Sequence, residues 1–237
     1  MEDDHDDIPM LLSTHTLSAL HEFLKDQQNA QDQFEKLRSR SEARYSENND
    51  KDGEDWQYDQ NTSQTIAEEI LINVANNKSE EYFRIACIST PTIFVKLKSL
   101  IRKSPNNNLL RAFLFEYDTR FDVYGKDFIH YDYKQPAQFR DAALLKGTFD
   151  FVVVDPPFLS EECCTKTMIT VRWLAKPEAC KIIVCTGEVM SDLVERLIKA
   201  RMTTFYPQHQ GGLANEFRCF VNYQSEVLKW NNDTSDS

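Results

Sequence analysis

Phe149 to Phe158 reads FDFVVVDPPF, and this stretch decides the predicted fold. Between Phe149 and Val154, only Asp150 interrupts a run of apolar, mostly β-branched residues. Such a run is typical of a strand that is buried on both faces of a parallel sheet. Because proline has no N–H to donate to a neighbouring strand, the strand must end at Asp155. We therefore expect Asp155 at the carboxyl end of a central strand, where open α/β sheets bind their ligands.

Asp155 and the next three residues, Pro156, Pro157 and Phe158, form a tetrapeptide with a chemistry of its own. A carboxylate accepts a hydrogen bond from an amine, and so does a backbone carbonyl that a proline frees from the sheet. Together they hold a nitrogen nucleophile, while the aromatic ring packs against a planar base or an alkylammonium stem. The pattern resembles the (Asp/Asn)-Pro-Pro-(Tyr/Phe) motif of S-adenosylmethionine-dependent methyltransferases that act on nitrogen. For these residues alone, a strand followed by a turn without chemistry stays an alternative.

Strand-like and helix-like patterns alternate along the chain. Apolar runs predict strands at 83–88, 112–117, 128–133, 149–155, 181–186, 202–206 and 216–223. Helical spacing predicts helices at 63–74, 92–102, 135–145, 161–174 and 189–199, with Ser160 as an N-cap. Because the loop between the last two strands is too short for a helix, we expect an antiparallel finish. The prediction is an α/β fold with a Rossmann-like, mostly parallel seven-stranded sheet; a doubly wound domain for another nucleotide is the alternative.

The composition changes along the chain and predicts its domain boundaries. We expect an acidic disordered tail at 1–12, an amphipathic helix at 13–38 and a polar linker at 39–55. The main domain then covers 56–228, and a loose tail covers 229–237.

The composition also limits the class of protein. No apolar run approaches the roughly 18 residues of a membrane span, and the acidic N-terminus is unlike a signal peptide, so we expect a cytoplasmic monomer away from membranes. In that compartment the six cysteines are expected as free thiols, and no CxxC spacing indicates a metal site. The formal net charge of −11 and the lack of a basic run make nucleic acid an unfavourable partner and a basic protein a better one.

The strand ends supply the candidate cofactor residues. The G-x-G turn that usually follows the first strand of nucleotide-binding α/β folds is absent, and Ser89 and Thr90 stand in its place. An acid at the end of the second strand commonly accepts the ribose hydroxyls of an adenosine cofactor, which makes Glu116 and Asp118 candidates. The third strand ends near the expected adenine position, and its candidates are Asp132 and Tyr133.

Several longer stretches are similar to the family of lysine methyltransferases that act on eukaryotic translation elongation factor 1-alpha, type 1, once assigned to N6-adenine DNA methyltransferases. The matching stretches are FLFEYDTRF (113–121), YGKDFIHYDY (124–133), FDFVVVDPPFLSEEC (149–163), CTGEVM (185–190) and LANEFRCFVNY (213–223). The stretch from Trp56 to Thr62 matches the family's FWYS-x-x-T box less closely. The resemblance implies a class I methyltransferase fold and methyl transfer from S-adenosylmethionine to a lysine of the elongation factor.

The resemblance also implies roles for individual residues. Asp155 and the Pro156 carbonyl orient the amine, and Phe158 packs the lysine stem. Glu116 and Asp118 belong to the ribose side, while the remaining cofactor candidates are Thr62, Ser89, Thr90, Asp132, Tyr133 and Asp155 itself. The candidates for the substrate rim are Trp56, Tyr58, Pro157, Asn215, Glu216 and Phe217. Ordinary strand-end polarity or aromatic packing stays an alternative for each of these residues.

Two functions of other classes remain open at this point. An N6-adenine methyltransferase uses the same tetrapeptide, with the aromatic ring stacked on a flipped base. A protein that binds the elongation factor without catalysis is the second alternative, because the G-x-G turn is missing.

Overall fold

The computed structural model describes residues 58–75, 82–104, 109–209 and 216–231. The chain divides into two units, Met1–Asp50 and Lys51–Ser237, and the described residues all belong to the second. The predicted acidic tail, amphipathic helix and linker, together with Trp56, Asn215 and the end of the chain after Asn231, lie outside the described residues.

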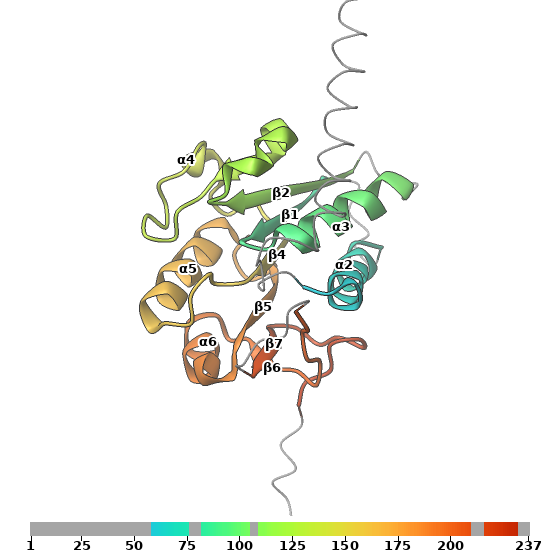
Figure 1. Ribbon diagram of the computed structural model, residues 1–237, viewed down its shortest axis with the longest axis vertical. Coiled ribbons are helices and arrows are strands. Elements are labelled where there is room, and N and C mark those ends of the chain that lie inside the picture. Colours follow the sequence, from blue (N-terminus) through green and yellow to red (C-terminus); the bar gives the residue numbers. More distant parts are fainter. Residues whose placement is uncertain (1–57, 76–81, 105–108, 210–215, 232–237) are drawn as a thin grey trace, which may run out of the picture. The chain divides into compact units, whose positions relative to one another are not determined.

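One sheet organises the described residues (Figure 1). Its strands are β1 (Phe83–Ile88), β2 (Leu110–Glu116), β3 (Phe128–His130), β4 (Phe151–Val154), β5 (Lys181–Gly187), β6 (Arg201–Met202) and β7 (Phe217–Val221). The strand order is β3-β2-β1-β4-β5-β7-β6. The first five strands pair in parallel, whereas β7 is antiparallel to both β5 and β6. The predicted seven-stranded, mostly parallel sheet with an antiparallel last strand is confirmed.

Helices cover both faces of this sheet. Helices α2 (Gln60–Ala75) and α3 (Pro91–Lys103) pack together on one face, and α5 (Glu161–Leu174) and α6 (Ser191–Ile198) pack together on the other (Figure 1). The remaining helices are short: α4 (Ala142–Leu145) and the 3-10 helices η2 (Thr119–Asp127) and η3 (Glu188–Met190). Within the described ranges, no helix is both long and apolar enough to cross a membrane.

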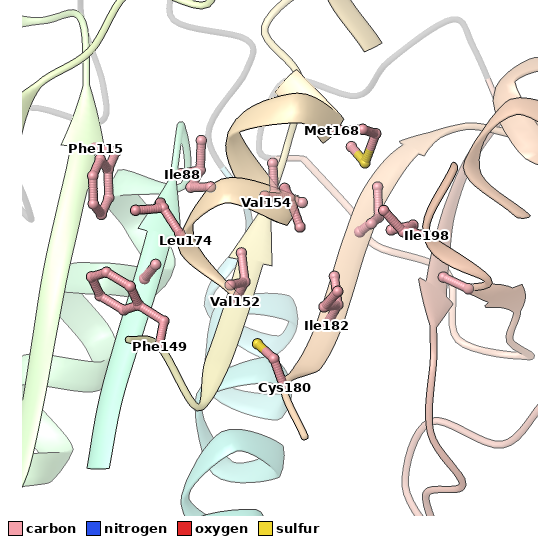
Figure 2. Close-up of a cluster of buried hydrophobic side chains, with 14 of the residues drawn as sticks. Ile88, Phe115, Phe149, Val152, Val154, Met168, Leu174, Cys180, Ile182 and Ile198 are labelled. Atoms are coloured by element: carbon pink, nitrogen blue, oxygen red, sulfur yellow. The ribbon is translucent and has the colours of Figure 1, made fainter. Parts of the chain in front are cut away.

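Strand β4 lies in the middle of the core, as the apolar run predicts. All four of its residues are fully buried. Val152 and Val154 belong to the hydrophobic cluster that faces α5, together with Phe115, Met168 and Leu174 (Figure 2). Because side chains alternate along a strand, the side chain at position 155 belongs to the opposite face, which α2 covers.

The predicted helix at 135–145 is wrong in its first half, where the chain forms turns and only Ala142–Leu145 is helical. The cause is competition for backbone carbonyls. The Thr170 hydroxyl donates to the Pro136 carbonyl at 2.8 Å, and the Arg140 guanidinium donates to the Phe128 carbonyl at 2.8 Å. Side chains thereby hold this segment against α5 and β3 in a conformation that a regular helix would not allow.

The predicted strand at 202–206 is shorter than expected, because β6 ends at Met202. The N–H of Thr204 donates to the Lys229 carbonyl at 2.8 Å, and the N–H of Asn231 donates to the Met202 carbonyl at 3.0 Å. After β6, Thr203 still bonds to the Cys219 carbonyl of β7, and from Thr204 on the chain pairs with residues 229–231. These residues were expected to begin the loose tail, but they are part of the folded domain.

An ionic contact fixes the other end of β4. Asp150 precedes the strand, and its Oδ2 accepts the N–H of Arg84 at 2.8 Å while its Oδ1 accepts the Lys176 ammonium at 2.6 Å. The Asp150 side chain is 15% exposed, so its partners replace most of the water that the carboxylate would otherwise bind.

Replacing Asp150 tests this contact. We expect Asp150→Ala to lower the free energy of unfolding by about 2 kcal/mol, because it leaves the Arg84 N–H and the Lys176 ammonium without their acceptor. Asp150→Asn keeps an acceptor for the N–H and should lose about half as much. Urea denaturation of the two variants measures the difference, and an unchanged midpoint in Asp150→Ala would contradict the assignment.

Candidate active site

The carboxyl ends of β1, β2 and β4 lie side by side. Ile88, the last residue of β1, pairs with Val154 at the end of β4 and with Phe115, one residue before the end of β2. Consequently Ser89, Glu116 and Asp155 emerge together at one edge of the sheet. The N–H of Asp155 still donates to the Ile88 carbonyl at 3.1 Å, so its backbone position is fixed by the sheet.

The carboxylate of Asp155 contacts a buried phenol. Its Oδ2 accepts a hydrogen bond from the hydroxyl of Tyr58 at 2.6 Å, and Tyr58 is only 2% exposed. Burial raises the pKa of Asp155 to about 8; the Tyr58 hydrogen bond opposes this rise, and the neighbouring Glu116 carboxylate adds to it. A carboxyl group with this pKa exchanges a proton near neutral pH, which is the range required for proton transfer in catalysis.

Tyr58, one of the candidates for the substrate rim, is thus a buried residue that contacts Asp155. It forms an antiparallel bridge with His209, and the two rings lie 4.6 Å apart. The hydroxyl of Thr62, a cofactor candidate, accepts the N–H of Gln208 at 2.9 Å. Both residues thus join the start of α2 to the chain after β6.

The two prolines and Phe158 take the chain from the buried strand to the surface. Pro156 is buried, Pro157 is exposed and Phe158 is 60% exposed. The Phe158 ring lies 5.7 Å from the ring of Tyr133, in an edge-on arrangement. The motif thereby offers an aromatic surface at the point where a substrate side chain would reach Asp155.

The end of the motif loop explains why β5 ends in glycine. A Cβ added at Gly187 would lie 2.6 Å from Cδ1 of Leu159, so a larger residue here would force the Leu159 side chain to move. The Ser160 hydroxyl then accepts the N–H of Cys163 at 3.2 Å and caps α5, as predicted.

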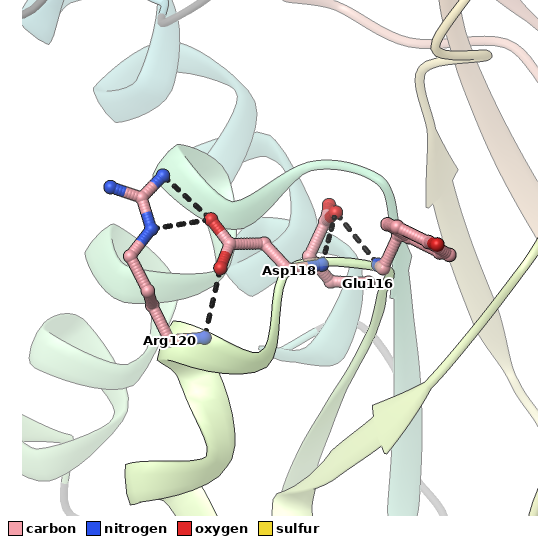
Figure 3. A network of polar contacts seen from close by, with 4 residues as sticks. Glu116, Asp118 and Arg120 are labelled. Carbon is pink, nitrogen blue, oxygen red and sulfur yellow. Dashed lines mark hydrogen bonds and ion pairs between the residues drawn. The ribbon is translucent and has the colours of Figure 1, made fainter.

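The two acids after β2 have different surroundings (Figure 3). Glu116 uses Oε1 to accept the N–H groups of Tyr117 at 2.7 Å and Asp118 at 3.2 Å, and its Oε2 is outside these bonds. Burial raises the pKa of Glu116.

Asp118 instead accepts the N–H of Arg120 at 2.8 Å and the guanidinium of Arg120 at 2.6 Å. Burial acts to raise the pKa of Asp118, but the bonds from Arg120 outweigh it and lower that pKa. Glu116 is thus available to a ligand, whereas Asp118 holds the start of η2.

The turn after β1 contains a left-handed residue although it lacks glycine. Ser89 has a φ of +51°, in the left-handed region that glycine normally occupies. Thr90 is 1% exposed, and among the described residues its hydroxyl meets no hydrogen-bond partner apart from the weakly bonding Cys87 thiol. A buried hydroxyl in this position, at the N-terminus of α3, fits a polar group of a bound ligand.

The ends of β2 and β3 contribute an exposed aromatic pair that the sequence interpretation missed. Tyr117 is 65% exposed, and its ring lies 5.3 Å from the ring of His130. The signal was an aromatic residue directly after the strand-end acid Glu116. Asp132 uses one carboxylate oxygen to accept the N–H of Lys134 at 2.9 Å and stays half-buried near this pair.

Arg218 connects the predicted rim residue Glu216 to the rest of the sheet edge and was also missed. Its guanidinium forms ion pairs with Glu216 at 3.1 Å and with Glu188 at 2.7 Å, and it lies 4.3 Å from the ring of Tyr206. Phe217, the other described rim candidate, packs its ring 4.8 Å from His209. Among the described residues, no group of three histidine, cysteine or acidic side chains is arranged to hold a metal.

Comparison with known proteins gives consistent matches over most of the chain. Residues 49–225 match a family model described as "Probable N6-adenine methyltransferase". The "EEF1A lysine methyltransferase 1" of Mus musculus is 38% identical over 94% of this chain and 96% of its own length. The protein of the same name from Gallus gallus is 40% identical over 95% of this chain and 99% of its own length. "Protein-lysine N-methyltransferase EFM5" of Saccharomyces cerevisiae is 34% identical over 92% of this chain and 94% of its own length.

The raised pKa of Asp155 predicts a pH-dependent cost to stability. Its ordinary pKa of 3.8 becomes about 8 in the folded protein, so stability is lost as the pH rises through this interval. Asp155→Asn removes the titration and keeps an acceptor for Tyr58. We expect the variant to gain on the order of 2 kcal/mol over the wild type between pH 5 and about pH 9, allowing for partial exposure. Urea denaturation across this range measures the gain, and parallel curves for the two proteins would contradict it.

Proposed function

The chain belongs to the EEF1A lysine methyltransferase 1 family, and from this premise we propose that it transfers a methyl group from S-adenosylmethionine to a lysine ε-amine of translation elongation factor 1-alpha. The observation that carries the proposal is the carboxylate of Asp155, held by Tyr58 at 2.6 Å, with the exposed ring of Phe158 three residues further along the chain. This arrangement offers an acceptor and an apolar surface to an amine on a long carbon stem.

Asp155 would perform two tasks on the incoming lysine. A lysine ammonium has no lone pair, so it must lose a proton before it attacks. The pKa of about 8 brings Asp155 closer to the pKa of an amine than an ordinary carboxylate, and the ionised form accepts that proton or a hydrogen bond. The carbonyl of Pro156 is a second hydrogen-bond acceptor, which fixes the direction of the lone pair on the lysine nitrogen. Phe158 packs against the carbon stem of the lysine.

The cofactor fits the groups left available at the strand ends. S-adenosylmethionine, when bound, would supply an electrophilic methyl group on a sulfonium. Oε2 of Glu116 is available for the ribose hydroxyls, and the buried hydroxyl of Thr90, with the turn at Ser89, suits the methionine part. The aromatic and polar groups that follow β2 and β3 would line the adenine, namely Tyr117, Asp132 and Tyr133.

The charge of the chain favours a protein substrate. The net charge of −11 attracts a basic partner and opposes the phosphates of a nucleic acid. The carboxylates of Glu216 and Glu188, at 75% and 42% side-chain exposure, lie near the start of β7, and both form ion pairs with Arg218. We propose that Phe217, Glu216, Pro157 and the undescribed neighbours Asn215 and Trp56 form the substrate rim of a cytoplasmic, monomeric enzyme.

The two strand-end acids should differ in their effect on cofactor affinity. We expect Glu116→Gln to weaken S-adenosylmethionine binding by about tenfold, because it removes the carboxylate available to the ribose. Asp118→Asn should change the affinity by less than about threefold, because Arg120 already occupies that carboxylate. Isothermal titration calorimetry measures both, and equal losses would contradict the assignment.

Methyl transfer itself is tested with labelled S-adenosylmethionine and two acceptors, purified elongation factor 1-alpha and adenine-containing DNA. We expect label on the protein, and a loss of about two orders of magnitude or more in Asp155→Ala. Asp150→Asn, at the other end of the same strand, is the matched control and should keep its activity. Label on DNA alone would establish the adenine methyltransferase instead, and label on neither would favour a binding protein without catalysis.

A further inference from the structure

We propose that Tyr58 is a positioning residue of the active site: its hydroxyl occupies Oδ2 of Asp155 and so presents Oδ1 to the substrate amine. The proposal rests on the methyltransferase function proposed above and assigns a role to a residue that touches the substrate only through Asp155. A carboxylate at the end of a strand has two equivalent oxygens and a broad range of side-chain rotation. A fixed hydrogen-bond donor on one oxygen makes the two oxygens different and limits the rotation of the side chain.

The geometry of the contact supports this role. The hydroxyl of Tyr58 lies 2.6 Å from Oδ2, which is the length of a charge-assisted hydrogen bond. Tyr58 is almost fully buried, and alternation along β4 places the Asp155 side chain on the same face of the sheet as the start of α2. The two groups therefore meet between the sheet and the start of α2, where Tyr58 is almost fully buried and Asp155 is half-buried.

Tyr58 is held by the ring of His209 and by bonds of the backbone next to it. Immediately after it, the N–H of Asp59 donates to the Gln208 carbonyl at 2.9 Å. The N–H of Gln208 in turn donates to the Thr62 hydroxyl at 2.9 Å. The ring of His209 covers the Tyr58 ring at 4.6 Å. A side chain with these anchors keeps its hydroxyl in one place when a substrate binds.

Among the described residues, none of the other titratable groups near Tyr58 and Asp155 stabilises the ionised Asp155 carboxylate as the Tyr58 hydrogen bond does. Those that interact with the pair come from β2, β5, α5 and the segment after β6: Glu116, Cys185, Cys163 and His209. A hydrogen bond with Cys219 and burial raise the pKa of the Cys185 thiol, burial raises the pKa of Cys163, and burial lowers the pKa of His209. Both thiols and the imidazole are therefore neutral at neutral pH, while the Glu116 carboxylate disfavours ionisation of Asp155.

Removing the hydroxyl has a consequence that a structural role alone would not have. A hydrogen bond donated to the carboxylate favours its ionised form, which is the form that accepts the substrate proton. Without it, the pKa of Asp155 rises further, and a smaller fraction is ionised at neutral pH. The acid limb of the pH profile of kcat/KM must then move to higher pH.

The experiment compares Tyr58→Phe with Tyr223→Phe. Tyr223 is a matched control, because its hydroxyl also donates to a buried carboxylate, Oε1 of Glu69, at 3.0 Å, and its ring packs on Phe151 at the opposite end of β4. In Tyr58→Phe we expect the acid limb of kcat/KM to move up by about one pH unit and the value at pH 7 to fall about tenfold, with recovery at high pH. In Tyr223→Phe we expect reduced stability and an unshifted limb.

Replacing Tyr58 site-specifically with 3-fluorotyrosine keeps the shape and the hydrogen bond, and guards against a folding defect in the phenylalanine variant. Its more acidic phenol is a stronger donor, so the acid limb should move to lower pH. A uniform fall in kcat/KM without a shift, in either Tyr58 variant, would overturn the proposal.

A measurement without substrate separates the two proposals. The stability of Tyr58→Phe, measured by urea denaturation from pH 5 to 9, should keep falling to a higher pH than that of the wild type, because the pKa of Asp155 is higher in the variant. If the wild type methylates nothing, the proposed function fails while this result still tests the pair. If the wild type is active and neither profile shifts, the role of Tyr58 fails alone.

Discussion

The hydrogen bond between Tyr58 and Asp155 joins the two parts of the structure on which the site depends. Asp155 follows a strand that is apolar and fully buried, so its carboxylate emerges in a place where ionisation is costly. An unpartnered carboxylate there would be protonated over most of the physiological range. The phenol keeps ionisation accessible and leaves one oxygen for a substrate. Burial and the Glu116 carboxylate raise the pKa of Asp155, the Tyr58 hydrogen bond lowers it, and the result is about 8.

This interaction explains why parts of the domain far from the motif matter to it. Tyr58 stands at the start of α2, and its position depends on the chain at 208–209, which follows the short strand β6. Residues 229–231 hold that chain in turn through bonds to Thr204 and Met202. A segment that seemed a loose tail therefore belongs to the support of the active site, and changes there would reach Asp155 through Tyr58.

The sequence predicted the parts of the site that depend on residues close together in the chain, and it missed contacts between residues far apart in the chain. The run before Asp155, the prolines after it and the acid that ends β2 are local signals, and they correctly placed Asp155 and Glu116 at strand ends. The partner of Asp155 lies 97 residues away in the chain, and no periodicity reveals such a contact. The same limit explains the error at 135–145, where side chains from α5 take backbone carbonyls that the local pattern assigned to a helix. Asp118 and Glu116 looked equivalent in sequence, and only the position of Arg120 distinguishes them.

The turn after β1 shows how the fold keeps a cofactor geometry while its usual residues are absent. A left-handed conformation costs a non-glycine residue about 1 kcal/mol or more, so Ser89 adopts it only because the surroundings require it. The requirement comes from the sheet, since the N–H of Ser89 donates to the Phe115 carbonyl at 2.8 Å and α3 begins at Pro91. Between these two fixed points the chain must turn sharply, and the small side chain of serine allows it. The strand register and the start of α3 thus impose a left-handed turn at Ser89 without a glycine.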